Sequence, residues 1–468
     1  MRCIVSGGEG ETGAAALRLA VTQPLFAWEA LEDSPSLQTV RHLLAILPDG
    51  RLLDALRRSR GHGRDDDPVQ TLWGVVLLTI LLRHPSFDAC LGELERNAAL
   101  RRLIGIPRAA DVPKKWNVSR FLKVLGAEPH LGLLHDVFDR MVRTLGGVVR
   151  DLGVHTAGDS TGLLAREEAD PDPALPAPAG GRKEYTDETG AVTKVLEWFG
   201  YKCHLLVDVR HEMALAYRGS STKRGDNEEL PALVAEAQAN LPEGRMKTLA
   251  YDKAADDGKV HACLATAGIE PVIQNRSLWK EEPERMLPGH DGRSNIVYDE
   301  AGTVYCHDKS KTRRGETSEP PVRHRMAFIG HEPRRGTLKY RCPAMHEGWR
   351  CPNHDRCNAG KKYGKTVRVR QEIDLRRFPP IPRATKQFER LYKGRTAVER
   401  VNARLKVFWG ADDGNLAGAA RFFGFLGAVL VIHASLATLL ASAPRREGTL
   451  GKMHLGAVQK ALREKLAG

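Results

Sequence analysis

The chain contains 468 residues, with a formal net charge of +13 and a pI near 9.4. This length allows two or three domains and a large core, which excludes a small scaffold held together by disulfides. Lysine and arginine occur along the whole chain, so a polyanion such as nucleic acid is favoured over a small acidic ligand. Structural basic proteins share this charge, and charge alone does not separate an enzyme from a binding protein.

Neither a secretion signal nor a membrane span is expected. Residues 1–20 lack a basic segment followed by a continuous apolar run. Residues 422–441 are the most apolar, but glycines, a histidine and a serine interrupt them, which predicts a buried helix. The eight cysteines, four of them clustered late in the chain, suit a reducing compartment and a metal site rather than a disulfide framework.

The N-terminal part is predicted to be helical. Residues 1–25 are glycine-rich and are expected to be poorly ordered, and residues 26–148 are expected to form an all-α, DNA-binding domain. Apolar residues recur at helical spacing in four segments: residues 37–60 with a break at Pro48-Asp49-Gly50, 71–83, 87–104 and 118–125. Basic residues surround a helix-turn-helix-like break at residues 105–113, namely Arg96, Arg101, Arg102, Lys114, Lys115 and Arg120. An ordinary exposed face is the alternative.

Two aspartates follow predicted strands. Residues 149–155 predict a strand that runs into Asp159, and residues 246–251 predict one that ends at Asp252. A carboxylate just past a buried strand is held rigidly at a sheet edge, where ligands tend to bind, although a turn aspartate is the simpler explanation. Between these two strands the pattern predicts a mobile loop over residues 165–190, an antiparallel pair over 198–208 and 213–218, and a helix over 230–239.

Beyond Asp252, a helix over residues 258–267 and a strand over 270–274 complete this region, and residues 277–382 then lose helical periodicity. Short strand-like pieces predict a β-rich insertion there. It contains four cysteines that would suit a structural zinc site, with three histidines nearby: Cys306, Cys342, Cys351 and Cys357, and His307, His346 and His354. The cysteine spacing is looser than in paired zinc motifs, so free thiols are the alternative.

Residues 392–406 carry the most informative pattern. Val398, Val401 and Leu405 form an apolar stripe, which predicts a single amphipathic helix. Its lone carboxylate, Glu399, lies among five cations, and this combination suits a site that holds a divalent metal and grips phosphates: Lys393, Arg395, Arg400, Arg404 and Lys406. A solvated basic helix with an internal ion pair is the alternative.

The spacing of Tyr392, Arg395, Glu399 and Lys406 resembles the signature around the last acidic residue of insertion-sequence DDE transposases, in the branch with a Tyr-Arg-Glu-Lys pattern. The phrases Gly158-Asp159-Ser160-Thr161, Phe199-Gly200-Tyr201-Lys202 and Tyr251-Asp252-Lys253 also resemble motifs of this family, as do parts of residues 93–121. The specificity lies in the conjunction of these motifs, since each one alone is weak. Ala255 departs slightly from relatives that place an aromatic residue nearby.

The resemblance implies an α/β, RNase H-like mixed sheet flanked by helices, with the helical N-terminal domain and the β-rich insertion. The catalytic domain would comprise residues 149–276 and 383–443, interrupted by the insertion at 277–382 and followed by a basic tail at 444–468. Asp159, Asp252 and Glu399 would be both catalytic residues and ligands of two Mg²⁺ (or Mn²⁺) ions. Phosphate contacts would come from the residues around them: Tyr392, Arg395, Lys406, Lys253, Arg400 and Arg404.

The function that this resemblance implies is cleavage and strand transfer at the inverted-repeat ends of an insertion sequence. The partners would be double-stranded DNA and a second copy of the chain in a synaptic dimer, in the cytoplasm of a bacterium close to the nucleoid. Two rival functions remain: a nuclease of the same fold without strand transfer, and a domesticated DNA-binding protein without catalysis.

Overall fold

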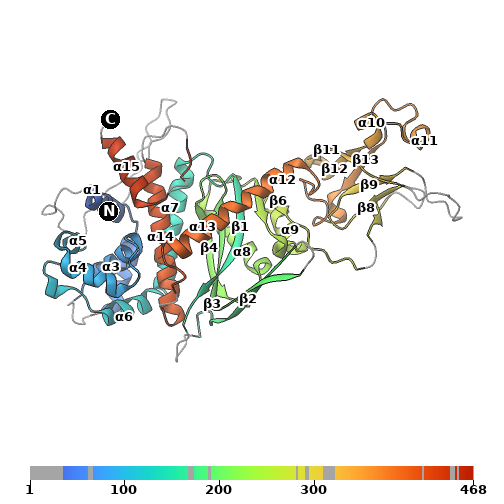
Figure 1. The fold of residues 1–468 in the computed structure, drawn as a ribbon. Helices are drawn as coiled ribbons and strands as arrows, with labels where there is room; N and C mark the ends of the chain where they lie inside the picture. Colours follow the sequence, from blue (N-terminus) through green and yellow to red (C-terminus); the bar gives the residue numbers. More distant parts are fainter. Residues whose placement is uncertain are drawn as a thin grey trace. The chain divides into compact units, whose positions relative to one another are not determined.

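The computed structural model describes residues 35–61, 67–166, 173–187, 191–280, 283–289, 295–308, 322–413, 416–442, 448–450 and 453–466 (Figure 1). The predicted disorder of residues 1–25 lies outside these ranges. The chain divides into two compact units. The first unit comprises residues 1–225, 232–245 and 396–468, and the second comprises residues 226–231 and 246–395. The predicted boundaries of the domains stay predictions.

The first unit begins with helices, as expected: α1 (Pro35–Ala45), α2 (Gly50–Arg60), α3 (Val69–Leu81), α4 (Phe87–Arg96), α5 (Ala98–Leu103), α6 (Lys115–Leu125) and α7 (His130–Val148). The break at Pro48-Asp49-Gly50 separates α1 from α2, because proline lacks the N–H that a continuous helix needs. Helix α3 is buried along almost its whole length and forms part of the core of this region. The helical N-terminal region is therefore confirmed.

The sheet of the first unit is antiparallel and contains β1 (His155–Leu164), β2 (Ala179–Thr186), β3 (Val192–Asp208) and β4 (Ala214–Ser221). The first half of β3 pairs with β2, and its second half lies between β1 and β4. Strand β4 confirms the predicted antiparallel partner of β3. Strand β1 pairs with β3 over nine positions, and this register places Asp159 opposite Leu205.

Two local predictions in this sheet are wrong. Residues 149–154 form a turn rather than a strand, because Gly153 adopts a φ of 82° there, and β1 begins only at His155, so that Asp159 lies within β1 instead of beyond a strand. The predicted loop over residues 165–190 contains β2. Polar residues dominate β2, so the alternation of apolar and polar residues that identifies a strand from sequence is missing.

Helix α14 (Ala419–Ser442) confirms the predicted buried helix. It packs against α3, α6 and α7 and also contacts β4 (Figure 1). The buried Nε2 of His433 accepts a hydrogen bond from the backbone N–H of Ala214 at 3.0 Å, and burial lowers the pKa of this histidine well below its ordinary value.

By length and composition α14 could cross a membrane, but 89% of its most apolar window is buried inside the protein, as in a core helix. Helix α15 (Leu455–Leu466) follows it.

The second unit contains a parallel pair, β5 (Thr248–Tyr251) and β6 (Glu270–Ile273), connected through α9 (Gly258–Thr266). Helix α8 (Asp226–Asn240) begins in this unit and continues into the first one. Parallel pairing in one unit and antiparallel pairing in the other, together with the helices, confirm the predicted mixed α/β class.

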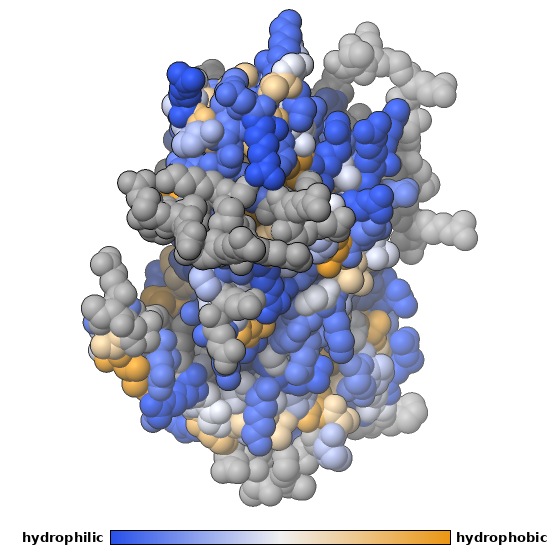
Figure 2. All heavy atoms as spheres, turned by 90° about the vertical axis from the view of Figure 1, so that its right-hand side faces the viewer, coloured by the Kyte–Doolittle hydropathy of each residue, from blue (hydrophilic) through white to orange (hydrophobic). Residues whose placement is uncertain are grey.

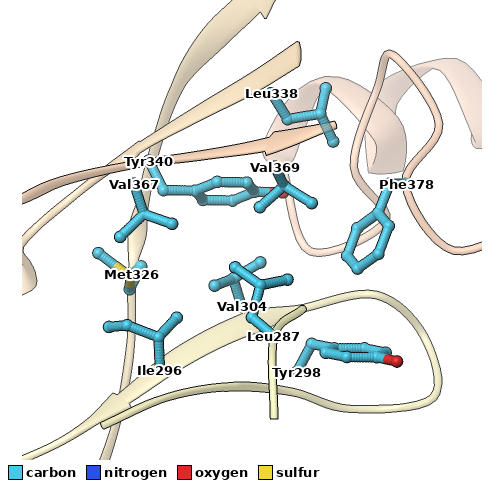
Figure 3. Packing of buried hydrophobic residues seen from close by; sticks show 10 residues of the cluster. All are labelled: Leu287, Ile296, Tyr298, Val304, Met326, Leu338, Tyr340, Val367, Val369 and Phe378. Atoms are coloured by element: carbon cyan, nitrogen blue, oxygen red, sulfur yellow. The ribbon is translucent and has the colours of Figure 1, made fainter. Parts of the chain in front are cut away.

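The predicted β-rich insertion consists of two small antiparallel sheets. One has the order β10-β9-β8-β7, and the other has the order β11-β12-β13. Their bounds are β7 (Arg285–Met286), β8 (Ile296–Tyr298), β9 (Val304–His307), β10 (Arg323–Arg325), β11 (Ala327–Glu332), β12 (Thr337–Arg341) and β13 (Thr366–Arg370). Short helices α10 (Pro343–Glu347) and α11 (His354–Asn358) separate β12 from β13. Both sheets contribute to one core of ten buried residues (Figure 3).

Residues 392–406 do not form the single helix that their periodicity predicts. Helix α12 (Lys386–Tyr392) is followed by a 3₁₀ turn (Lys393–Arg395), α13 (Thr396–Ala403) and a π-helical segment (Arg404–Phe408). The helical run is therefore continuous from Lys386 to Phe408, but it changes type at Lys393 and again at Thr396 and Arg404. Gly394 lies in the 3₁₀ turn, and glycine weakens a helix interior because of the backbone entropy it loses.

One face of the molecule is covered mainly by hydrophilic residues, and hydrophobic residues form only small patches on it (Figure 2).

Candidate active site

The first candidate metal ligand is Asp159, which lies in strand β1. Its side chain is partly buried, and its Oδ1 accepts a hydrogen bond from the N–H of Ser160 at 2.9 Å. The strand on either side is held by β3, so the position of the Asp159 backbone is set by sheet pairing rather than by a loop.

The second candidate ligand, Glu399, is exposed on α13. The predicted apolar stripe is confirmed, since Val398, Val401 and Leu405 are at most 1% exposed. With this stripe buried, α13 packs against β1 and β3, and Glu399 remains on the accessible side. The structure thus brings together the two elements that carry Asp159 and Glu399.

Polar contacts fasten the π-helical segment to β1. Lys406 donates from Nζ to the carbonyl oxygen of Gly162 at 2.7 Å and pairs with Asp412 at 2.9 Å. Asp412 in turn accepts a hydrogen bond from the N–H of Leu164 at 2.7 Å. Charge-assisted hydrogen bonds of this kind are stronger and more directional than neutral ones. They position the chain that follows Glu399 against the strand that carries Asp159.

A second anchor joins α13 and the segment after it to the turn between β3 and β4. Arg400 Nε lies 2.6 Å from Glu212 Oε1, and Arg404 Nη2 lies 2.7 Å from Glu212 Oε2. Arg404 also donates to the backbone oxygen of Glu212 at 3.3 Å. Glu212 has a φ of 51°, an uncommon value for a residue other than glycine, and two arginines hold it there.

These contacts bear on the residues that are predicted to contact DNA. The side chains of Arg404 and Lys406 are only 16% and 25% exposed, whereas that of Arg400 is 53% exposed. In the second unit, Lys253 is exposed and Tyr392 donates from its hydroxyl to Gln274 Oε1 at 3.1 Å. Arg395 is partly buried and ends the 3₁₀ turn. Their roles in DNA binding stay predictions.

The third candidate ligand, Asp252, follows β5 directly, as the sequence predicts. Its Oδ1 accepts a hydrogen bond from the N–H of Ala254 at 2.8 Å and caps a short 3₁₀ turn, which fixes the side chain at the strand end. Asp252 belongs to the second unit, whereas Asp159 and Glu399 belong to the first. The convergence of all three carboxylates stays a prediction.

Among the described residues, one set of three potential metal ligands has its ligand atoms within 4.8 Å of one another: His135, Asp139 and Glu236. Burial lowers the pKa of His135, but the hydrogen bond and charge of Glu236 outweigh that effect and raise it overall. Asp139 accepts from Asn240 at 2.6 Å, Glu236 accepts from the N–H of Tyr217 at 3.3 Å, and the His135 ring stacks on Tyr217. These contacts tie α7 to α8 and β4, so we interpret the set as a packing network.

Sequence reasoning missed Glu212 and Asp412, which position α13 and the segment after it. No local pattern distinguishes either residue from an ordinary turn carboxylate. Glu212 precedes its partner Arg404 by 192 positions, and Asp412 follows Leu164 by 248, so only the tertiary structure identifies these contacts.

The family model for the Transposase DDE domain matches residues 152–434, which is more than half of the chain. This chain belongs to the DDE transposase family. The matched segment contains Asp159, Asp252 and Glu399, as well as the insertion between the last two. The resemblance noted in the sequence motifs is therefore confirmed. Transposases are a class of enzymes that act on DNA.

The other comparisons add little to this assignment. A solved structure described as a piggyBac transposase synaptic complex with hairpin DNA is 11% identical, with coverage of 94% of this transposase and 81% of that chain. The TM-score is 0.35, which is too low to carry an argument about fold or function. The comparison with curated proteins gave no match.

Proposed function

We propose that this transposase cuts the inverted-repeat ends of its own insertion sequence and joins them to target DNA, with Asp159, Asp252 and Glu399 as the catalytic carboxylates. The observation that carries the proposal is the family match across all three acids. It is supported by the packing of α13, which bears Glu399, against β1, which bears Asp159. The Tyr-Arg-Glu-Lys spacing supports the same choice of glutamate.

The donor set fits Mg²⁺ or Mn²⁺. All three side chains offer carboxylate oxygens, which these hard cations prefer. Asp159 and Asp252 are only partly buried and Glu399 is exposed, so water and phosphate oxygens could share the coordination of a bound ion. Two bound ions would activate the attacking oxygen and stabilise the leaving oxygen of the phosphoryl transfer.

The remaining contacts of the site hold α13 in position. Lys406, bonded to Gly162 and Asp412, and Arg404, bonded to Glu212, set the orientation of α13 before DNA binds. Arg400, about half exposed, and Lys253, exposed, are better placed to contact phosphates of double-stranded DNA. Two copies of the transposase would act together on the two ends of the element.

The test uses the full chain and labelled DNA carrying the ends of its element, with Mg²⁺. Asp159→Asn, Asp252→Asn and Glu399→Gln should each reduce cleavage by about a thousandfold or more, since metal coordination contributes several kcal/mol to the barrier. Glu389→Gln is the matched control, because Glu389 lies on α12, pairs with Lys393 at the surface and has no assigned role in catalysis. Full cleavage by any of the three variants would contradict the assigned triad.

Joining of a pre-cut end to target DNA distinguishes the proposal from its closest rival. A nuclease without strand transfer would cut the ends and leave the pre-cut end unjoined. A DNA-binding protein without catalysis would bind the ends and do neither, with or without the divalent ion.

A further inference from the structure

The four late cysteines come from separate segments of the insertion in the second unit. Cys306 lies in β9, Cys342 directly follows β12, and Cys351 and Cys357 lie before and within α11. β9 and β12 belong to different sheets, so any group that bound all four thiols would link both sheets and α11.

Hydrogen bonds bring α11 to Cys342. The buried amide of Asn358, next to Cys357, donates from Nδ2 to Cys342 Sγ at 3.6 Å. Asn358 Oδ1 accepts from the N–H of Lys365 at 2.7 Å, and Lys365 accepts through its carbonyl oxygen from the N–H of Cys342 at 2.8 Å. A donor aimed at a cysteine sulfur is typical of the shell around metal-bound thiolates.

Two further contacts bring β9 to the same place. Lys365 Nζ donates to Asn295 Oδ1 at 3.3 Å, and Asn295 Nδ2 donates to the carbonyl oxygen of His307, the neighbour of Cys306. The cross-strand partner of Cys306 is His324, whose ring lies 4.6 Å from that of Trp349, two positions before Cys351. The segments that carry Cys306, Cys342 and Cys351 therefore meet.

The four thiols lie near one another. Cys306 is close enough to Cys342, Cys351 and Cys357 to interact electrostatically with each of them. All four are free cysteines. Within the described part of the chain no three of these sulfurs lie within 4.8 Å of one another, so the thiols are gathered but not at coordination distance.

The nearby histidines are poorer ligands. His307 directly follows Cys306 in β9, and consecutive side chains of a strand point to opposite faces of the sheet. Its Nε2 is already 3.0 Å from Glu284 Oε1. His354 pairs through Nδ1 with Asp355 at 3.2 Å. The four sulfurs form the more consistent set.

We propose that Cys306, Cys342, Cys351 and Cys357 bind one Zn²⁺ ion in a structural site that fastens the two small sheets and α11 together. Four thiolates in tetrahedral geometry are a closed set of zinc ligands that leaves no position for substrate. Such a link would stabilise the insertion, because its strands are short and, among its described residues, the two sheets share a small core of ten buried residues with Trp279, Cys306 and Phe328 packed against it (Figure 3). Nothing in this proposal depends on transposition.

The test measures metal content of the full-length transposase, purified from zinc-supplemented cells without chelator. Elemental analysis should find about one zinc per chain. Cys342→Ser and Cys306→Ser should lose it. Cys263→Ser is the matched control, because Cys263 lies on α9 of the same unit and belongs to no described cluster of ligands, so its zinc content should equal that of the wild type.

A second measurement keeps the proposal testable if the serine variants fold poorly. Wild-type transposase reconstituted with Co²⁺ should show the intense thiolate-to-cobalt absorption of a tetrahedral sulfur site. The proposal is overturned if the wild type contains no zinc, if the Co²⁺ form lacks this absorption, or if zinc is retained in Cys342→Ser and lost in His135→Gln. The last result would assign the metal to the His135, Asp139 and Glu236 set instead.

Discussion

The two units each bury an aspartate, but they do so with different partners. In the first unit, Asp49 accepts a hydrogen bond from Trp73 Nε1 at 2.8 Å, and burial raises its pKa from 3.8 to about 6. In the second unit, Asp256 accepts hydrogen bonds from Arg376 at 2.8 Å and Arg383 at 3.0 Å and also contacts His261. Burial alone would raise its pKa, yet these partners lower it to about 2.

The difference shows that burial by itself does not decide the charge of an interior carboxylate. A single neutral donor leaves Asp49 easier to protonate, whereas two guanidinium groups and a histidine keep Asp256 ionised. Asp256 also accepts a hydrogen bond from the N–H of Arg276, just after β6, so this ionic centre links residue 276 with residues 376–383 of the second unit.

The largest effect is expected from Asp256→Asn. The substitution leaves Arg376 and Arg383 buried without their anion, which should cost about 3–5 kcal/mol of unfolding free energy. Urea unfolding followed by circular dichroism measures the loss. Asp355→Asn is the control, since the Asp355 side chain is 99% exposed, and it should change stability by less than about 0.5 kcal/mol. Equal stability of both variants would remove the ionic centre from the account of the second unit.

The apolar packing of the first unit can be broken with Gly126→Ala at the end of α6. A Cβ there would lie 1.6 Å from the carbonyl oxygen of Ala420, a backbone atom at the start of α14. We expect a loss of about 3 kcal/mol, at the upper end of overpacking effects. Gly92→Ala is the matched control: it lies inside α4 with no atom within 4 Å of the added Cβ, and should stabilise the chain by about 0.5–1 kcal/mol.

The two aspartates should give opposite pH dependences. The raised pKa of Asp49 contributes stability below about pH 4 that is lost as the pH rises through about 6. The lowered pKa of Asp256 contributes stability above about pH 4 that is lost as the pH falls towards 2. Each slope approaches ~1.4 kcal/mol per pH unit at most. Denaturant midpoints of the wild type, Asp49→Asn and Asp256→Asn across this range measure both signs, and slopes of the same sign would refute the comparison.

The smallest stability effect is expected at the anchor of the π-helical segment. Lys406→Met removes the hydrogen bond to Gly162 and the ion pair with Asp412. It should lower the free energy of unfolding by about 1–2 kcal/mol and should also reduce cleavage activity. Lys393→Met, at a surface pair with Glu389, should cost less than about 0.5 kcal/mol. If Lys406 acts only as a phosphate contact, its loss should weaken DNA binding and reduce its salt dependence without changing stability.

Sequence patterns predicted most elements that are defined by local periodicity. Apolar residues recur at helical spacing in the N-terminal helices, an apolar run marks the strand before Asp252, and α14 is the most apolar segment of the chain. Sequence patterns failed where contacts with a distant part of the chain decide the local conformation. Strand β2 is polar and depends on pairing with β3, and the helix predicted over residues 392–406 is divided into segments that dock on different partners.

The candidate site shows the same division. Spaced motifs were enough to select Asp159, Asp252 and Glu399, because each lies in a short phrase that resembles a motif of the family and within the matched segment, and their catalytic roles stay predictions. The residues that orient α13 could not be selected in this way. Glu212 and Asp412 act through side-chain contacts with residues distant in the sequence, and such contacts leave no local periodicity.

The amino-acid sequence by itself determined that this protein is a basic, mixed α/β member of the DDE transposases and which acidic residues to test. Those conclusions follow from charge, periodicity and motif spacing, which are properties of neighbouring residues. The tertiary structure alone decided where α13 docks, which cations are used as internal anchors and that four dispersed cysteines gather in the insertion. Each of these depends on long-range packing, which places residues together according to the fold and not according to their order in the chain.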